Sequence, residues 1–582
     1  MKVLKNILFV LVLVVMIAPL LQKELNFVND SPLNGDFVEY NKPEFSWSSC
    51  YNGIFQTAYD QYLEQHIGFH NTLVRIKNQL DYSLFRKPNA EGIVIGKDDF
   101  IFEYDYIREL TGRDYVGFKF IDEKLRRLQY VQQYLRTTKG IDLVVVFMPG
   151  KASFYREYIP DKYIMGKEDS TNYTIYLQQI KKRGIRHIDL NQYFHQIKLE
   201  STFPLFPKYG THWSIYGMSK AAHVILDSIE QFKGKKMNDF NTDSLLISSV
   251  PLRTDYDGGN ALNLVANLSE EEFAYPRYIF GKDSSRYKPK VLTIGDSFYW
   301  NIFNAGIPQN LFTNEAFWYY NNKIYPDFYT HPIYTSEIDL KEEVEQMDVI
   351  FIMVTERFLN IFDWKLIDQL YYLYTPEYVK NPKYDYVNGI LLDPSWFNKL
   401  LSDAMAKNMT NEQELYRHAR HLYQTNQNID FMIEYGLEVY IDYYRSKQEL
   451  ELMVRKKAIQ NNLTYEEMLV EEADYLFRMQ KPEIHQRYIR IHDYIYKLER
   501  DSTAMDSIGS LARKYHCKLK DMMYYQAKWM VEEEDIQDVV QRILSDKNWT
   551  LKIKEKARKN NISFREMLHK DAIYVLQQKK GK

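Results

Sequence analysis

The sequence has little cysteine and no long basic run: only Cys50 and Cys517 occur among 582 residues. Two thiols so far apart exclude a disulfide-stapled scaffold and a cysteine-rich metal site. The formal net charge of −3 and the lack of a basic stretch argue against nucleic acid as a partner. Charged residues make up 26% and hydrophobic residues 45% of the chain, a composition typical of folded domains. No pattern indicates a metal or a tightly bound cofactor.

One long apolar run stands at the N-terminus. Lys2 and Lys5 precede an uncharged apolar stretch from Ile7 to Leu21, the layout of a signal sequence. The segment "MIAPLLQ" offers no small-x-small cleavage site, which favours an uncleaved anchor with the lysines inside, and cleavage stays open. We therefore predict a signal anchor or signal peptide over residues 1–22. The rest of the chain is then extracytoplasmic, attached to the cell membrane and periplasmic in a Gram-negative cell.

Apolar runs and helical patterns alternate through the middle of the chain. Residues 45–85 have helical spacing, so we expect an N-terminal helical extension over 23–85, and residues 92–103 predict a hairpin that turns at "GKDD". Short β-branched runs at 141–149, 288–298 and 347–357 are separated by amphipathic helices. This alternation predicts an α/β domain over 86–395, with a parallel sheet flanked by helices. Functional groups gather beyond the carboxyl ends of such strands.

The C-terminal part repeats itself. Four segments, 404–419, 458–473, 512–527 and 557–572, each begin and end with alanine, fifteen residues apart. Three of them carry a Ser or Thr followed by Gln or Glu at the spacing of a helix capping box: Thr410 and Gln413, Thr464 and Glu467, Ser563 and Glu566. Each copy predicts a helical hairpin, and together they predict an all-α repeat domain over 396–582 that serves as an interaction surface or support.

The segment "VLTIGDSFYWN" (291–301) is the strongest chemical signal. An apolar strand runs directly into Gly295, Asp296 and Ser297. Gly295 allows a tight turn that would expose the Ser297 hydroxyl beside backbone N–H groups, which could hold an oxyanion. The alternative is an ordinary strand-to-helix turn in which Asp296 or Ser297 caps the helix.

A nucleophilic serine needs a base, and His212 in "KYGTHWSIYG" (208–217) is the candidate. A predicted helix follows directly and would pin the loop at a strand end. The alternative is a structural or solvated histidine.

The order "THW" first and "GDSF" later resembles the AlgJ/AlgX-type alginate O-acetyltransferase family, whose domain is SGNH-hydrolase-like. The segments "GKDDFIF" (96–102), "VVVFMPGKASFYREYIPD" (144–161) and "VTER" (354–357) are similar to further segments of that family. The resemblance covers roughly residues 45–360 and leaves out the repeats. It implies that Ser297 is the nucleophile and His212 the general base.

The sequence departs from the family at Gly210, where the family usually has the aspartate that orients the histidine. Three interpretations stay open: a Ser–His dyad, another carboxylate, or loss of catalysis. Glu356, at the end of its strand, is the preferred substitute acid. Asp255 and Asp257 in "TDYDGGN" are poorer candidates, because that segment predicts a turn.

Five more residues are candidate substrate contacts. Lys151 or Arg357 could hold an anionic or sugar group, or could be a loop lysine and a structural ion pair. Tyr209, Trp213 and Tyr299 flank the proposed pair and could line a carbohydrate groove or pack in the core.

The predicted function is O-acyl transfer, most simply of acetyl, to hydroxyls of a cell-surface or secreted polysaccharide through an acyl-serine. The resemblance implies a membrane-bound O-acyltransferase partner, since an acetyl donor made in the cytoplasm must cross the membrane. The alternatives are a polysaccharide O-acetyl esterase and a non-catalytic polysaccharide-binding or assembly factor.

Overall fold

Six strands form the central sheet of the computed structural model, which describes residues 2–35, 39–166, 170–268, 272–327, 331–376, 379, 383–407, 409–425, 429–560 and 562–580. Their order across the sheet is β4 (His187–Asp189), β3 (Asp142–Met148), β10 (Val349–Thr355), β7 (Val291–Gly295), β8 (Phe317–Tyr319) and β9 (Lys323–Tyr325). The first five strands are parallel and β9 runs antiparallel to β8. The predicted α/β class is thus confirmed.

The three central strands are the predicted apolar runs. Every residue of β3, β7 and β10 is buried, as expected for parallel strands covered on both faces. In the register, Gly295 lies opposite Met353, and Thr355 lies opposite Met148. The segments that follow β3, β7 and β10 therefore leave the sheet along one edge.

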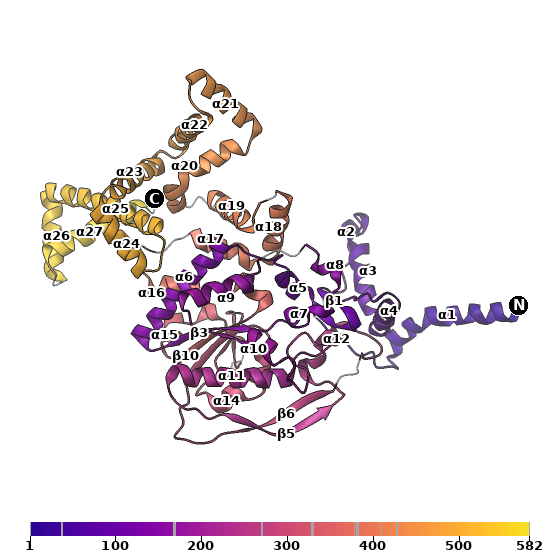
Figure 1. Ribbon diagram of the computed structural model, residues 1–582. Coiled ribbons are helices and arrows are strands. Elements are labelled where there is room, and N and C mark those ends of the chain that lie inside the picture. Colours follow the sequence, from indigo (N-terminus) through magenta and orange to yellow (C-terminus); the bar gives the residue numbers. More distant parts are fainter. Residues whose placement is uncertain are drawn as a thin grey trace. The chain divides into compact units, whose positions relative to one another are not determined.

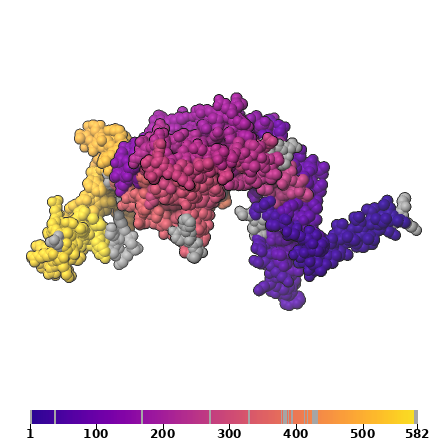
Figure 2. Space-filling view, turned by 90° about the horizontal axis from the view of Figure 1, so that it is seen from below, coloured from indigo at the N-terminus to yellow at the C-terminus, as the bar shows by residue number. Residues whose placement is uncertain are grey.

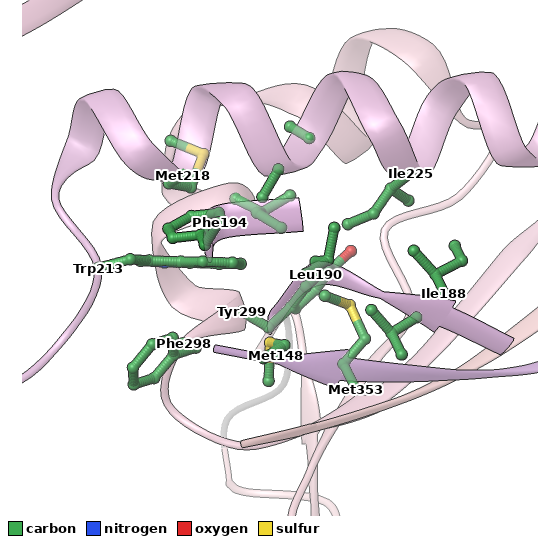
Figure 3. Close-up of a cluster of buried hydrophobic side chains, with 14 of the residues drawn as sticks. Met148, Ile188, Leu190, Phe194, Trp213, Met218, Ile225, Phe298, Tyr299 and Met353 are labelled. Atoms are coloured by element: carbon green, nitrogen blue, oxygen red, sulfur yellow. The ribbon is translucent and has the colours of Figure 1, made fainter. Parts of the chain in front are cut away.

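Helix α11 (Ile215–Lys233) packs its apolar side against the sheet (Figure 1). Figure 3 shows Met218 and Ile225 of this helix facing Met148, Ile188 and Met353. Ser214 caps the helix, since its Oγ accepts a hydrogen bond from the N–H of Gly217 at 2.9 Å. The loop that carries His212 is therefore anchored immediately before a buried helix.

The N-terminal region is helical. It contains α1 (Lys2–Leu25), α2 (Trp47–Tyr51), α3 (Ile54–His66) and α4 (His70–Phe85), and the hairpin of β1 (Ile93–Ile95) and β2 (Ile101–Glu103) follows. Val3–Leu25 is the one stretch of the described chain that is long and apolar enough to cross a membrane; its most apolar window is not buried, whereas Gln22 near its end is. Figure 2 shows this helix as the indigo rod.

The chain divides into two compact units. Residues 1–115, 141–174 and 186–362 form the first, and residues 116–140, 175–185 and 363–582 form the second. The first also contains α5 (Tyr104–Leu110), α7 (Lys151–Phe154), α8 (Asp161–Ile164), α10 (Leu190–Ile197), α12 (Asp257–Ala261), α13 (Tyr299–Asn304), α14 (Ile307–Leu311), α15 (Leu340–Glu345) and the ribbon of β5 (Phe240–Ser248) and β6 (Phe273–Phe280). Helix α9 (Asn172–Arg183) contributes residues to both units.

The second unit is helical and holds the predicted hairpins. The hairpin pairs are α18 (Pro394–Ala406) with α19 (Asn411–Thr425), α21 (Gln448–Asn461) with α22 (Tyr465–Gln480), α24 (Ser502–Lys514) with α25 (Leu519–Ser545), and α26 (Lys547–Lys559) with α27 (Phe564–Lys580). The other helices are α6 (Phe118–Tyr134), α16 (Leu366–Tyr374), α17 (Lys383–Leu392), α20 (Ile429–Arg445) and α23 (Pro482–Glu499).

The repeated alanines lie where the paired helices meet. All eight, from Ala404 to Ala572, are buried. Thr464 and Glu467 form a full capping box, because each side chain bonds to the backbone N–H of the other. Thr410 and Gln413 do the same, which confirms the predicted helix starts in these copies.

Candidate active site

Ser297 lies in the turn that joins β7 to α13. The neighbouring Asp296 is fully buried and fixes the turn, since its carboxylate accepts hydrogen bonds from the N–H of Phe298 (3.0 Å) and from the N–H (2.9 Å) and hydroxyl (2.7 Å) of Thr355. Burial raises the pKa of Asp296 above its ordinary value. Gly295 lets β7 lie close to β10, because an added Cβ would be 3.2 Å from the carbonyl oxygen of Met353. These contacts hold a half-buried Ser297 at the carboxyl edge of the sheet.

His212 contacts the serine directly. Its Nε2 lies 2.8 Å from Ser297 Oγ, and its Nδ1 is hydrogen-bonded to the carboxylate of Asp257. With the Nδ1 proton donated to Asp257, Nε2 is left to accept the serine proton. The His212 side chain is 14% exposed, so the pair is sheltered but open on one side.

Asp257 is held in place by three further donors. Its carboxylate accepts hydrogen bonds from the backbone N–H groups of Thr211 and Gly258, both at 2.6 Å, and from the Thr211 hydroxyl at 3.1 Å. Burial raises its pKa, but His212 and these donors outweigh burial, so the pKa of Asp257 lies below its ordinary value. Burial likewise lowers the pKa of His212, but the attraction and hydrogen bond of Asp257 prevail and leave the pKa of His212 raised.

Ser297, His212 and Asp257 therefore form a hydrogen-bonded chain with the connectivity of a Ser-His-Asp triad. The sequence pattern favours Glu356 over Asp257 as the acid, whereas the structure places Asp257 next to His212. The only available sign for Asp257 was an acidic residue in a Gly-rich turn, which is common in turns of no catalytic role.

Glu356 lies elsewhere and has other partners. It is 2% exposed, and its Oε1 accepts hydrogen bonds from the Ser153 hydroxyl (3.0 Å) and from the side-chain amide of Asn191. Burial raises the pKa of Glu356 to about 7. Glu356 was expected next to His212, but Asp257 occupies that position.

Lys151 supports the histidine loop from inside the protein. It is 1% exposed, and its Nζ donates hydrogen bonds to the carbonyl oxygens of Lys208 (2.8 Å) and Gly210 (2.6 Å). The N–H of Gly259 also reaches this loop, at the carbonyl oxygen of Tyr209 (2.8 Å). Because the Lys151 ammonium is buried and bonded in this way, it positions the loop. The sequence had suggested a different role for Lys151, a contact with the substrate.

Gly210 has no room for a side chain. An added Cβ would lie 2.4 Å from Pro207 Cγ and 2.9 Å from the carbonyl oxygens of Thr254 and Asp255. The loop that bears Asp257 thus packs against the backbone of Gly210, at the position where the family usually has its aspartate. Asp255 has a separate role at the start of α11, where it accepts a hydrogen bond from the N–H of Ile215 at 3.2 Å.

Arg357 lies beside the triad. Its guanidinium pairs with Glu103 and lies over the rings of Tyr106 (5.1 Å) and Phe358 (4.7 Å). Its Nε is buried and has no hydrogen-bond partner in the described part of the chain. Arg357 also lowers the pKa of His212, although burial and Asp257 have larger effects. Of the two predicted cationic contacts, Arg357 is the one that lies near His212.

The predicted aromatic contacts belong to the core. Trp213 is fully buried between Phe194 and Phe298, with ring centroids at 6.1 and 5.3 Å. Tyr209 packs on Tyr256, and Tyr299 packs on Phe317. Of the two roles that the sequence left open for these rings, core packing is the one the structure gives.

Among the described residues, the group with metal-ligand spacing is Asp403, Glu414 and His418, in the helical repeats. Glu414 already pairs with Lys407 (2.8 Å) and Arg417, and the indole N–H of Trp396 donates to Nδ1 of His418. These contacts account for the cluster without an ion.

A comparison with family models agrees with the resemblance noted in the sequence. Three similar solved structures are the O-acetyltransferase domain of Pseudomonas putida AlgJ (17% identity, 48% of this chain and 99% of that one, TM-score 0.31), Pseudomonas aeruginosa AlgX (18%, 45% and 55%, TM-score 0.27) and Bacillus cereus PatB1 (11%, 42% and 91%, TM-score 0.27). A search of curated protein sequences found no match. Residues 93–268, which include His212 and Asp257 but end before Ser297, match the family model of the SGNH hydrolase-like domain of the acetyltransferase AlgX, which confirms that this chain carries a domain similar to that family.

Proposed function

We propose that the chain is an extracytoplasmic O-acyltransferase that acetylates hydroxyl groups of a polysaccharide through an acyl-serine at Ser297. The observation that carries this proposal is the hydrogen-bonded chain from Ser297 through His212 to Asp257. The match of residues 93–268 to an acetyltransferase domain supports the choice of acyl group.

In the first half-reaction, Ser297 Oγ attacks the carbonyl carbon of the acyl donor while its proton passes to Nε2 of His212. Asp257 keeps Nδ1 protonated and stabilises the imidazolium that forms. The donor's leaving group then departs with the proton from Nε2, and the acetyl group remains on Ser297 as an ester. In the second half-reaction, a sugar hydroxyl gives its proton to Nε2 of His212 and attacks the ester carbonyl carbon. The bond from this carbon to Ser297 Oγ then breaks, and Nε2 passes the proton to Oγ, which regenerates the Ser297 hydroxyl.

The oxyanion of each tetrahedral intermediate needs a donor beside Ser297. The backbone N–H of Ser297 has no protein acceptor within the residues the structure describes, and it belongs to the turn that Asp296 fixes. We assign this N–H as one oxyanion donor, with the unpaired Nε of the neighbouring Arg357 as a second candidate.

The donor side of the reaction involves the membrane. Helix α1 is long and apolar enough to span a bilayer, and its most apolar window is not buried, which supports an anchored enzyme. A membrane-bound O-acyltransferase that passes the acetyl group outward is the partner we propose.

The test is intact-mass analysis of the full chain in detergent after incubation with 4-nitrophenyl acetate, alongside Ser297→Ala and His212→Ala. We expect one added acetyl group on Ser297, absent from Ser297→Ala and strongly slowed in His212→Ala. Peptide mapping checks the position. A folded protein that neither gains acetyl nor turns over the ester would overturn the proposal in favour of a non-catalytic binding role.

A second measurement separates transfer from hydrolysis. The acetylated protein is mixed with neutral and uronic-acid oligosaccharides, and the products are analysed by mass. Acetyl found on a sugar supports the transferase. Release as acetate alone, at the rate seen without sugar, would identify an esterase.

A further inference from the structure

The third hairpin breaks the repeat at its turn. After the alanine that ends the common helix, the other copies have asparagine at the fourth position (Asn408, Asn462, Asn561) and Thr or Ser at the sixth (Thr410, Thr464, Ser563). The third copy has His516 and Lys518 at these two positions. Lys518 gives α25 no side-chain cap, whereas Thr464 caps α22 fully. The other copies all keep these turn residues. Their replacement in the third copy therefore indicates that the side chains at positions 516 and 518 serve a purpose other than shaping the turn.

The replaced residues dock the turn onto α6. The Nε2 of His516 lies 3.0 Å from the side-chain oxygen of Gln133, and Lys518 forms an ion pair with Glu123. His516 adopts φ 49°, in the left-handed region that Asn462 occupies at φ 56° in the second copy. The turn therefore keeps the backbone shape of the repeat but presents different side chains.

A pocket of about 500 Å³ opens where this turn docks. Its lining comes from α6, the end of α9, the end of α24 and the following turn: Arg126, Arg183, Gly509, Ala512, Arg513, His516, Cys517 and Leu519. All of these residues belong to the second compact unit. Three are arginines and none is acidic, and the volume is in the range of small-ligand sites.

The arginines are incompletely neutralised. Arg126 and Arg183 share one carboxylate, that of Asp122. The Nε of Arg183 is buried and has no hydrogen-bond partner among the described residues. Arg513 forms no ion pair with any residue that the structure describes. Glu123 and Asp521 also lie within electrostatic range of Arg126, so the cationic excess is concentrated on Arg183 and Arg513.

We propose that this pocket binds an oxyanion group, a carboxylate or a phosphate, of a sugar-sized ligand or polymer segment, with Arg183 and Arg513 as the principal donors and His516 at its wall. Planar guanidinium groups bind such anions through paired N–H donors. Gly509 lies beside the Arg513 guanidinium: a Cβ added to Gly509 would lie 3.6 Å from Arg513 Nη1, an ordinary contact distance.

The chain supplies a matched control. Arg558 follows its alanine in the fourth hairpin as Arg513 does in the third, and it does not line this pocket. Both side chains are exposed, so replacing either by glutamine leaves the core intact. His516→Asn restores the turn residue of the other three copies, and folding is therefore expected to be kept.

The experiment is isothermal titration of the full chain in detergent, at low salt, with sodium glucuronate, inorganic phosphate and glucose. We expect at least one anion to bind and glucose not to bind. Arg513→Gln should weaken anion binding by about tenfold or more, Arg558→Gln should leave it unchanged, and His516→Asn should weaken it while the melting temperature is kept. Binding of glucuronate alone or of phosphate alone identifies the source of the oxyanion.

The proposal is overturned if neither anion binds the unaltered chain, or if Arg513→Gln and Arg558→Gln weaken binding equally, because the effect would then be general surface charge. The readout is binding in the helical unit, so its failure is distinct from failure of the acetylation of Ser297.

Discussion

The two units differ in how far apart in the sequence their contacting residues lie. In the α/β unit, His212 reaches Asp257 across 45 residues and Ser297 across 85. In the repeats, two equivalent ion pairs each stay inside one hairpin: Lys457 with Glu472, and Lys556 with Asp571, 15 residues apart in both cases. A site assembled from distant loops depends on everything that holds those loops, whereas a helical repeat depends on its own hairpin and on its direct neighbours. Changes in the first unit should therefore act at a distance, whereas the loss of one helix cap in the second should loosen mainly its own helix.

The largest effect is expected from Asp257→Asn. The backbone N–H groups of Thr211 and Gly258 both bond Oδ1 of Asp257, so the amide oxygen is expected there and the amide NH2 then faces His212. The NH2 donates to Nδ1, which places the imidazole proton on Nε2 and leaves Nε2 unable to take the serine proton. Acetylation of Ser297 should slow by about 10,000-fold. The rate is measured by the release of nitrophenol from the activated ester.

Glu356→Gln is the control for this prediction. It removes a carboxylate at the same edge of the sheet that does not touch His212. We expect a loss of less than about tenfold. Comparable losses in the two variants would contradict the assignment of Asp257 as the orienting acid.

An intermediate effect is expected from Gly210→Asp, which restores the residue usual in the family. The new side chain would meet the carbonyl oxygens of Thr254 and Asp255, and the role it fills elsewhere is already taken by Asp257. We expect the two loops to separate by enough to slow acetylation by about 100-fold and to lower the melting temperature. Unchanged or improved activity would show that the two loops are not tightly packed here.

The smallest effect is expected from Thr464→Ala, which removes the capping box of α22. The helix start should lose about 1 kcal/mol of stability. Hydrogen exchange should show faster exchange only in the first turns of α22, and ester turnover should be unchanged. Ser563→Ala is the counterpart and should affect only α27. Exchange that spreads to other hairpins would break the contrast between the two units.

The predictions that succeeded rest on local patterns. The apolar runs at 141–149, 288–298 and 347–357 contain β3, β7 and β10, and the paired alanines mark the hairpin contacts. The sequence could not reveal that β10 lies between β3 and β7, because strand order depends on long-range packing. The pattern of apolar residues along the chain was therefore sufficient to predict individual strands and helices, but not the order of the strands in the sheet.

The candidate site was predictable only in part. Ser297 and His212 were expected together, and they lie 2.8 Å apart. Asp257 was ranked below Glu356 because its proximity to His212 depends on how two loops pack, which no spacing encodes. Lys151 was misread for a similar reason: a lysine after a strand is usually solvated, and only the fold reveals that the carbonyl oxygens of Lys208 and Gly210 surround it.

Helix α25 has a mechanical consequence for the C-terminal end. It runs without interruption for 27 residues, about 40 Å. It pairs with α24 along one part and with α26 and α27 along another. A flexible linker would let the last two hairpins move independently. Because both contact the same continuous helix, they are expected to move as one rigid body. A force or ligand acting on the final hairpin would therefore be transmitted to the turn that carries His516.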